Sequence, residues 1–276
     1  MLPTWDQPPV NMPMPPELER ITTIFFIAAA TLITAGTVVL ALRRRTLVYP
    51  MLVLGGALCT FNEPALNIPA KIWHARSDNF PLLEEFGRPM PLWVPFGYLM
   101  FFSALPVILL VLLERGAGYR RVWQAMAAFW VLDTITEVIL TGDGGMYTYY
   151  GYQPFAIGDF CSGQLVTNGT GITLIAVILH RAPWMFRGAR ALLAIPLVPV
   201  MQFAALAVAA PGFWAMNSDA GHVWQWVGMA AALVIGVFVI DVLLRLGTAT
   251  PLLGAPHTHR SPAAPSQTDA VLSHHA

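Results

Sequence analysis

Residues 129–155 decide the fold, and they read FWVLDTITEVILTGDGGMYTYYGYQPF. An apolar run carries two acids, Asp133 and Glu137, and then opens into a segment rich in Gly and Tyr. On a helix this spacing places both side chains on one face, about 6 Å apart along the axis. A membrane-spanning helix keeps such acids where they face protein or water, because each costs about 2.5 to 3.5 kcal/mol at the bilayer centre. We expect an acid–base site here, against the alternative of a polar pair that only fixes helix packing.

The composition is that of a membrane protein. Of the 276 residues, 56% are hydrophobic and 11% are charged, whereas about 25% are charged in ordinary soluble domains. The formal net charge is zero and the aromatic residues lie inside apolar runs, so nothing suggests nucleic acid as a partner. Two cysteines, Cys59 and Cys161, support neither a disulfide framework nor a Cys-rich metal site, and we expect both to be small core residues.

Apolar runs of about 20 residues, enough to cross the hydrocarbon core, recur along the chain. Seven such runs cover residues 21–42, 46–66, 91–113, 122–141, 159–180, 189–210 and 222–246. The expected fold is therefore all-α, a polytopic bundle of seven transmembrane helices. Three parts are expected: a tail over residues 1–20, the helical domain over 21–247, and a disordered tail rich in Pro and Ser over 248–276.

The basic residues predict the orientation, because cytoplasmic loops hold the excess of Lys and Arg. Eleven of the fifteen lie after the first, third or fifth run or at the C-terminal end of the seventh and beyond it, which predicts an outside N-terminus and a cytoplasmic C-terminus. Arg greatly outnumbers Lys, which favours a bacterial source and hence a bacterial plasma membrane. Aromatic residues near the outer ends of the runs are expected to form an interfacial belt: Trp73, Trp93, Trp214, Trp224, Tyr147, Tyr149, Tyr150 and Tyr152.

Counted along their helices, most polar residues of the runs fall in the outer half of the expected bundle. Unconnected stretches thus bring their costly groups to one level, which predicts a shared pocket near the outer leaflet. The expected catalytic residues are Glu63, Asp133 and Glu137. The expected substrate-binding residues are Asn62, Asn67, Trp130, Tyr147, Tyr149, Tyr150, Gln164 and Asn168.

Other polar residues receive more modest interpretations. The connection at residues 67–90 is too long for a tight turn, and it is either a lid over the pocket or a solvated loop held at the interface by its charges. His74 and His222 are expected to be interfacial hydrogen-bonding residues rather than ligands. Asp241 precedes Arg245 by four residues near the cytoplasmic end of the last run, which predicts an ion pair rather than a catalytic role.

Paired carboxyl groups suggest a specific chemistry. In a poorly hydrated pocket one member stays protonated and acts as a general acid while the other remains a base. Such a pair protonates an alkene, epoxide, ketal oxygen or hydroxyl, and aromatic walls stabilise the resulting cation through cation–π attraction. The chain lacks the DDxxD, DxDD and NSE-type motifs that bind Mg²⁺ for diphosphate ionisation. We therefore expect neither a metal nor a cofactor.

Two stretches carry a family resemblance. Asp133 and Glu137 precede Gly145-Met146-Tyr147-Thr148-Tyr149-Tyr150-Gly151, and an earlier segment reads Asn62-Glu63-Pro64-Ala65-Leu66-Asn67. Together they resemble actinobacterial multi-span membrane proteins of the avermectin-type spirocyclase family. The resemblance implies a membrane-integral enzyme that closes or dehydrates rings in a lipophilic natural product.

A second resemblance is to the seven-span, membrane-integral terpene cyclases that make meroterpenoids. These carry a functional Glu in the second span and an Asp in the last. Glu63 fits the first position, whereas Asp241 fits the second poorly because it lies close to the cytoplasmic interface.

The expected function is therefore a metal-independent cyclase, of the terpene cyclase or spirocyclase type, acting on a lipophilic terpenoid or polyketide intermediate. Its expected partners are this small molecule and membrane lipid. A proton-coupled transporter and a non-catalytic membrane assembly subunit remain open alternatives, since intramembrane acids also form proton relays. A microbial rhodopsin is excluded, because retinal binding needs a lysine in the last span and the only lysine is Lys71, in a loop.

Overall fold

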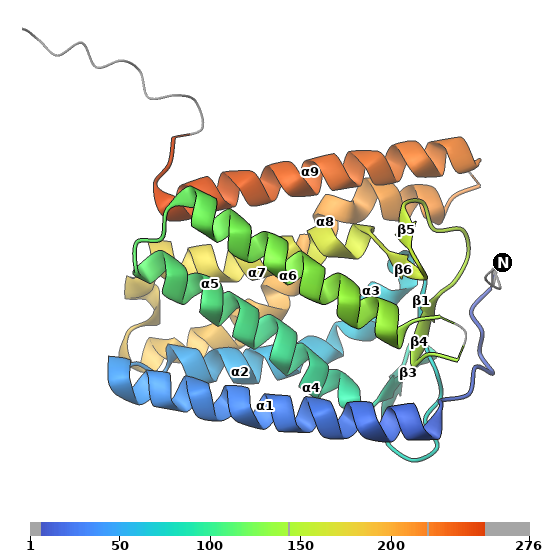
Figure 1. Cartoon of the computed structure of the whole chain (residues 1–276), viewed down its shortest axis with the longest axis horizontal. Helices are drawn as coiled ribbons and strands as arrows, with labels where there is room; N and C mark the ends of the chain where they lie inside the picture. The colour runs from blue at the N-terminus through green and yellow to red at the C-terminus, as the bar shows by residue number, and fades with distance from the viewer. Residues whose placement is uncertain (1–6, 143, 220, 252–276) are drawn as a thin grey trace, which may run out of the picture.

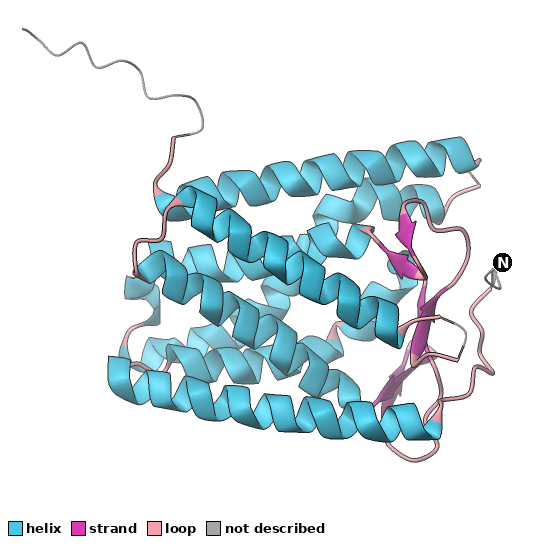
Figure 2. Cartoon of the chain, in the orientation of Figure 1, coloured by secondary structure: helices cyan, strands magenta, loops and turns pink. Residues whose placement is uncertain are grey.

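The structure is a computed structural model that describes residues 7–142, 144–219 and 221–251. Over these residues the chain forms a bundle of long helices with short strands gathered at one end (Figures 1 and 2). The expected helical bundle is confirmed. The tail expected over 248–276 lies outside the described residues from 252 onward, as do the first six residues of the expected N-terminal tail.

Within the described residues, six helical segments are long and apolar enough to cross a membrane. Four are single helices: α1 (Pro16–Arg44), α6 (Tyr119–Leu140), α7 (Gly163–Arg181) and α9 (His222–Thr248). The other two are composite: α4 (Trp93–Leu99) continues through the π-helical turn η2 (Met100–Ala104) into α5 (Leu105–Glu114), and η4 (Gly188–Leu193) continues into α8 (Ala194–Met216). A further 3₁₀ turn, η3 (Pro183–Phe186), follows α7.

The second expected run, 46–66, is broken into pieces. It forms α2 (Val48–Leu58), the 3₁₀ turn η1 (Cys59–Phe61) and α3 (Glu63–Ala70). Pro64 is a sufficient cause of the break, since its ring nitrogen cannot donate a helical hydrogen bond and proline is tolerated only in a first turn. The apolar part, Val48–Phe61, is shorter than the other candidate spans. Glu63 therefore stands where the helix restarts, at the first residue of α3.

Six short strands, which the all-α expectation missed, cover one end of the bundle in the described structure. Strand β1 (Ile72–His74) pairs antiparallel with β4 (Tyr147–Tyr149), β2 (Pro81–Glu85) with β3 (Arg88–Pro91), and β5 (Ala156–Ile157) with β6 (Phe160–Cys161). We call these strands and their turns the β-cap. Strands β1 and β3 of the 67–90 connection are buried against the bundle, whereas residues 76–87, which include β2, are largely exposed, in the pattern of a solvated loop.

The aromatic belt expected from the sequence is wrong for most of its members. Five of them are at least nine-tenths buried in the β-cap or beneath it: Trp73, Trp93, Tyr147, Tyr149 and Tyr150. The cause is the pairing of β1 with β4, which folds both strands back over the end of the bundle. Trp214 and Trp224 remain exposed, at 74% and 66%, and keep the interfacial interpretation.

The opposite half of the bundle has a separate apolar core. It is built from buried Leu, Ile, Val and Met side chains of α5, α6, α7 and α9, including Leu109, Leu113, Met126, Ile175 and Leu244. The cysteines are both buried and free, as expected. The buried carboxyl groups Glu63 and Asp133 are not part of this core and lie in the half of the bundle next to the β-cap.

Candidate functional site

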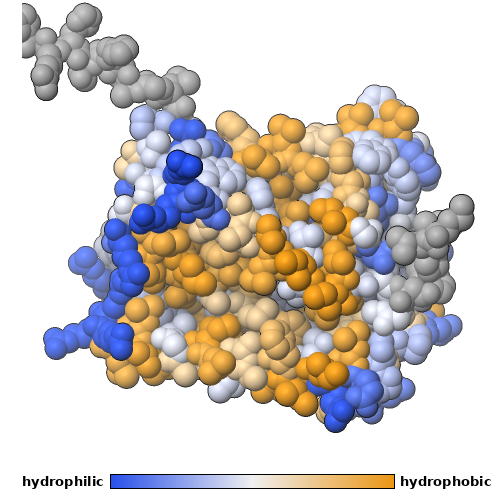
Figure 3. Space-filling model, in the orientation of Figure 1, coloured by the Kyte–Doolittle hydropathy of each residue, from blue (hydrophilic) through white to orange (hydrophobic). Residues whose placement is uncertain are grey.

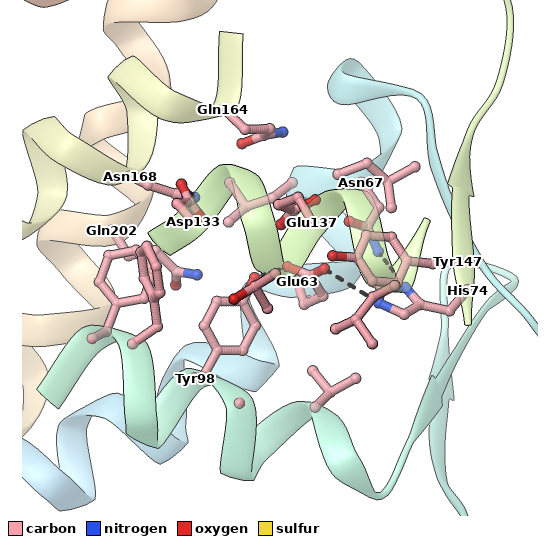
Figure 4. Close-up of a pocket in the computed structure, with 18 of the residues that line it drawn as sticks. Glu63, Asn67, His74, Tyr98, Asp133, Glu137, Tyr147, Gln164, Asn168 and Gln202 are labelled. Carbon is pink, nitrogen blue, oxygen red and sulfur yellow. Dashed lines mark hydrogen bonds and ion pairs between the residues drawn. The ribbon is translucent and has the colours of Figure 1, made fainter. Parts of the chain in front are cut away.

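Beneath the β-cap lies a cavity with a volume of about 120 Å³. Its walls come from α1, α3, α4, η2, α6, α7 and α8, with β1 and β4 above. The polar side chains that line it are Glu63, Asn67, His74, Tyr98, Asp133, Glu137, Gln164, Asn168 and Gln202 (Figure 4). The structure thus brings all three expected catalytic acids to one cavity, although Glu63 is far from the other two in sequence.

Glu63 receives its contacts from the β-cap and from α4. The Tyr98 hydroxyl donates a hydrogen bond to its carboxylate, and Nε2 of His74 lies 3.7 Å from its Oε1 atom. One turn further along α3, the Asn67 amide contacts Nδ1 of His74 at 3.2 Å. The two contacts of His74, with Glu63 and with Asn67, are drawn as dashed lines in Figure 4. Glu63 is only 7% exposed, so these neighbours replace most of the water around it.

His74 is a neutral member of this group. Burial, together with the positive charge of Arg88 as a smaller cause, lowers its pKa to about 3. A neutral imidazole carries one proton, and the Asn67 Nδ2 group is a donor, so Nδ1 of His74 accepts and Nε2 holds the proton. His74 therefore points an N–H group toward Glu63, and its ring is stacked against Tyr147 at 5.1 Å.

Asp133 and Glu137 occupy the cavity side of α6, as their spacing predicted. Nδ2 of Asn168 donates to Oδ2 of Asp133 at 3.1 Å, and the Tyr149 hydroxyl donates to Oε2 of Glu137 at 2.9 Å. Within the described part of the chain, no Arg or Lys forms an ion pair with either acid. Each carboxyl group is therefore held by a neutral donor.

The glycine-rich turn after α6 places the tyrosines over these acids. The chain reverses so tightly that Met146 N donates to Leu140 O at 2.8 Å, and β4 begins at the next residue. A Cβ atom on Gly145 would stand 2.7 Å from Leu140 O, so this position has room only for glycine. The turn is thus the reason that Tyr147 and Tyr149 follow α6 directly and line the same cavity.

The two tyrosines remain hydrogen-bond donors. Burial raises the pKa of Tyr147 and of Tyr149 well above the usual value, and the nearby charge of Glu137 acts in the same direction. Both hydroxyl groups therefore keep their protons at any physiological pH.

Of the eight expected substrate-binding residues, five line the cavity: Asn67, Tyr147, Tyr149, Gln164 and Asn168. The other three lie behind the wall. Asn62 donates to Pro199 O at 2.7 Å and to Gln202 Oε1 at 2.9 Å, which joins the start of α3 to α8. Trp130 donates to Leu165 O at 2.8 Å, and Tyr150 accepts from Arg88 at 2.8 Å. These three support the site instead of facing a ligand.

Several lining residues were not predicted. His74, expected at the interface, is 3% exposed because the antiparallel pairing of β1 with β4 draws it inward. Tyr98 lies in an apolar run beside Gly97 and gave no clear signal. Gln202 could have been predicted from the sequence. It is the single amide or charged side chain in α8, and such a residue in an apolar run needs a partner.

Two expectations outside the cavity can be compared with the structure. Arg245 Nε contacts Oδ2 of Asp241 at 2.7 Å, so the expected ion pair is confirmed at the end of α9 far from the β-cap. Asp241 also accepts from Trp123 at 3.1 Å and does not line the cavity. His222 begins α9 and stacks on Tyr152 at 4.0 Å, also outside the cavity lining.

Among the residues that the structure describes, no group of three or more His, Cys, Asp or Glu side chains is placed to hold a metal ion. Neither a protein-family model, nor a curated protein, nor a solved structure matches this chain. Function is therefore inferred from the cavity itself.

Proposed function

We propose that the protein is a membrane-integral cyclase that uses carboxyl groups as general acid and base on a lipophilic substrate. The observation that carries this proposal is that Glu63, Asp133 and Glu137 face one cavity from two separate helices. An acid and a base on different elements can act on opposite sides of one molecule. That geometry suits a reaction that begins by protonation and ends by proton loss.

The three acids take different roles in this proposal. Glu137, beneath Tyr149, gives its proton to an alkene, epoxide, ketal oxygen or hydroxyl of the substrate. The ring closes on the resulting cation, and Glu63 removes the departing proton. Glu63 begins the reaction as the carboxylate, because Tyr98 and the Nε2–H group of His74 stabilise its negative charge. Asp133, one turn deeper, returns a proton to Glu137, and the proton that Glu63 removed then replaces it, so the cycle consumes no net proton.

Aromatic rings line much of the cavity and support a cationic intermediate. They include Phe26, Trp93, Phe101 and Phe102 beside Tyr98 and Tyr147. The faces of such rings attract a cation within about 6 Å. The same walls are apolar and exclude water, which would otherwise capture the cation before the ring closes.

Three features support the seven-span arrangement with an outside β-cap. The start of α1 lies beside the β-cap and α9 ends at the opposite end of the bundle, which requires an odd number of crossings (Figure 1). The α2–η1–α3 segment supplies the seventh crossing in this proposal. The Arg residues of the connections that follow α1, α5 and α7 lie at the end opposite the β-cap, which we call the Arg-rich end. Because cytoplasmic loops hold such residues, the cavity belongs to the outer half of a bacterial plasma membrane.

The transporter alternative has less support. A proton-coupled carrier needs polar groups that continue across the membrane, whereas the half next to the Arg-rich end is filled by an apolar core. The sequence resemblance to spirocyclases also favours ring closure. A non-catalytic assembly subunit would leave the three acids without a role, since a cavity is unnecessary for helix packing.

The proposal is tested by product analysis. Membranes containing the wild-type protein or the Glu63→Gln/Glu137→Gln double variant are incubated with prenylated phenols, their terminal epoxides and dihydroxyketone precursors of spiroketals. The wild type is expected to form a product of unchanged mass, or lighter by one water, and the double variant is expected to form none. Equal conversion by both proteins would contradict acid–base catalysis, and a wild type inactive on every class would leave no support for a cyclase.

A further inference from the structure

The exposure of the lining residues shows where the cavity opens. Those facing the β-cap, including Ile72, His74 and Trp93, are buried, so this side is closed. Most of the half-buried lining residues lie on two elements: Gly97, Tyr98, Met100 and Phe101 on α4 and η2, and Thr136 and Glu137 on α6. A lining residue is half-buried where a cavity meets the surface. The opening therefore lies between α4–η2 and the outer half of α6.

Helix packing explains why a gap exists at this place. α5 and α6 pack together and are joined by a short connection at the Arg-rich end, but α4 packs mainly on α1 and α2, whereas α6 packs mainly on α5, α7 and α9. The two elements thus belong to different sides of the bundle near the β-cap. The π-helical turn η2 precedes Pro106, which cannot donate to the carbonyl of Phe102. Such turns occur frequently at functional sites.

The surface around this opening is apolar. On α6, Val131, Leu132, Ile135, Val138 and Ile139 are all at least 45% exposed. Figure 3 shows apolar side chains over this face, with a hollow near its middle. In a bilayer these side chains contact acyl chains, so the opening meets hydrocarbon and not water.

The cavity is also small and divided in polarity. Its volume of about 120 Å³ is close to that of a roughly 150 Å³ cavity that holds one benzene molecule. The carboxyl groups and His74 make part of its lining polar, whereas the half-buried Met100 and Phe101 of η2 give the opening an apolar border. A terpenoid or polyketide is several times larger than benzene, so only its reacting part fits among the acids.

We propose that the substrate is an amphiphile that enters sideways from the bilayer between α4–η2 and α6. Its reactive polar end reaches Glu63 and Glu137, and its apolar chain stays in the opening beside Met100 and Phe101. The identity of the substrate class rests on the proposed function, but the entry route does not. It can be measured without turnover.

The test uses a cysteine placed in the opening. Thr136→Cys in sealed vesicles is exposed to membrane-partitioning pyrene maleimide or to the charged reagent sulfonatoethyl methanethiosulfonate. The wild type is the background control, because Cys59 and Cys161 are both 0% exposed. Leu82→Cys, on the exposed strand β2, is the positive control for the charged reagent. We expect pyrene maleimide to label Thr136→Cys and the charged reagent not to label it.

A second pair of variants narrows the opening. Gly97 lines it, and a Cβ atom there would meet its nearest neighbour, Trp93, at an ordinary 3.7 Å. Gly97→Ala is thus a matched control, and Gly97→Leu is expected to remove most pyrene labelling of Thr136→Cys. Ile135→Cys, exposed on the lipid side of α6, should be labelled equally in both backgrounds and controls for protein amount and reagent access, and an unchanged melting temperature shows that Gly97→Leu is folded.

The outcomes separate the route from the chemistry. Rapid modification of Thr136→Cys by the charged reagent, or full pyrene labelling in the presence of Gly97→Leu, would overturn the lateral route. A long-chain C15 alcohol carrying a diazirine tests the amphiphile, and its photoadducts are expected on η2 and α6 peptides. Adducts confined to the β-cap would contradict its placement. These results stand whether or not the protein shows cyclase activity.

Discussion

Nε2 of His74 lies 3.7 Å from Oε1 of Glu63, and this contact joins the β-cap to the first residue of α3. Because the pKa of His74 is lowered to about 3, the imidazole is neutral and the contact is that of an N–H group beside a carboxyl group. The β-cap therefore contributes to the cavity chemically as well as sterically. It stabilises the carboxylate form of the residue that we propose as the base.

His74 gives a pH-dependent stability that can be measured. Its pKa is lower in the folded protein than in the unfolded chain, so its contribution is fully present above about pH 6.5 and declines as the pH falls toward 3. His74→Gln cannot titrate. The difference in melting temperature between the wild type and His74→Gln, in detergent, is expected to shrink from pH 7.5 to pH 5. A difference that stays constant would contradict the neutral, buried imidazole.

Amide substitutions test the acids one at a time. Glu137→Gln and Glu63→Gln keep the side-chain shape and remove the titrating proton, so each is expected to lower kcat by about 10² to 10⁴. Asp133→Asn should cost less, because it acts through Glu137. Turnover is measured at matched expression in membranes. Near-wild-type kcat for both Gln variants would exclude the acid–base roles, and failure of all three variants to fold would favour a structural role.

The tyrosine contacts allow a milder change. Tyr149→Phe removes the hydroxyl that donates to Glu137 at 2.9 Å but keeps the ring. We expect a smaller loss of kcat than for Glu137→Gln, with normal expression. Tyr152→Phe is the matched control, since Tyr152 lies outside the cavity lining and stacks on His222. Equal effects of the two substitutions would show that the Tyr149 hydroxyl has no specific role.

Gly145→Ala tests the turn that follows α6. The added methyl group would meet the carbonyl oxygen of Leu140 at 2.7 Å, so β4 must shift away from the helix. A loss of about 1–3 kcal/mol in stability, the usual cost of overpacking, is expected. Gly118→Ala has nothing within 4 Å of the new atom and serves as the control. Equal melting temperatures for both variants would show that the turn tolerates a side chain.

Cysteine labelling checks the orientation. Single cysteines at the exposed positions Leu82 and Phe155 are expected to react with an impermeant reagent added outside, because both lie in the β-cap. Cysteines replacing Arg120 and Arg187, at the Arg-rich end, are expected to react only after permeabilisation. Outside reactivity of the cysteines at positions 120 or 187 would show that the orientation is the reverse of the proposed one, with the cavity in the inner leaflet.

The sequence predicted local features well. The run at 122–141 corresponds closely to α6, and the spacing of Asp133 and Glu137 placed both on its cavity side. The run at 46–66 was instead predicted as one continuous span, and Pro64, which interrupts helical hydrogen bonding, accounts for its break. These properties depend on periodicity and on neighbouring residues, which a single sequence displays directly.

The β-cap was not predicted, because its pairing joins distant residues. Ile72, Trp73 and His74 pair with Tyr149, Thr148 and Tyr147, some 75 positions away, and three-residue strands carry little periodicity. Without this pairing the aromatic residues resemble an interfacial belt, and His74 resembles a surface residue. Tyr98 was not predicted for a similar reason, because its partner Glu63 lies on another helix.

The β1–β4 ladder has a mechanical consequence. β1 follows α3, which begins with Glu63, and β4 follows α6, which carries Glu137. The spacing of the two opposing acids is therefore fixed by backbone hydrogen bonds across the β-cap, and not only by helix packing. When bilayer thickness changes and the helices tilt, the ladder acts as a cross-brace at the end where the acids lie. A separation of α4 from α6 would leave this ladder intact, because neither helix has to move relative to its own strand for the β1–β4 pairing to persist.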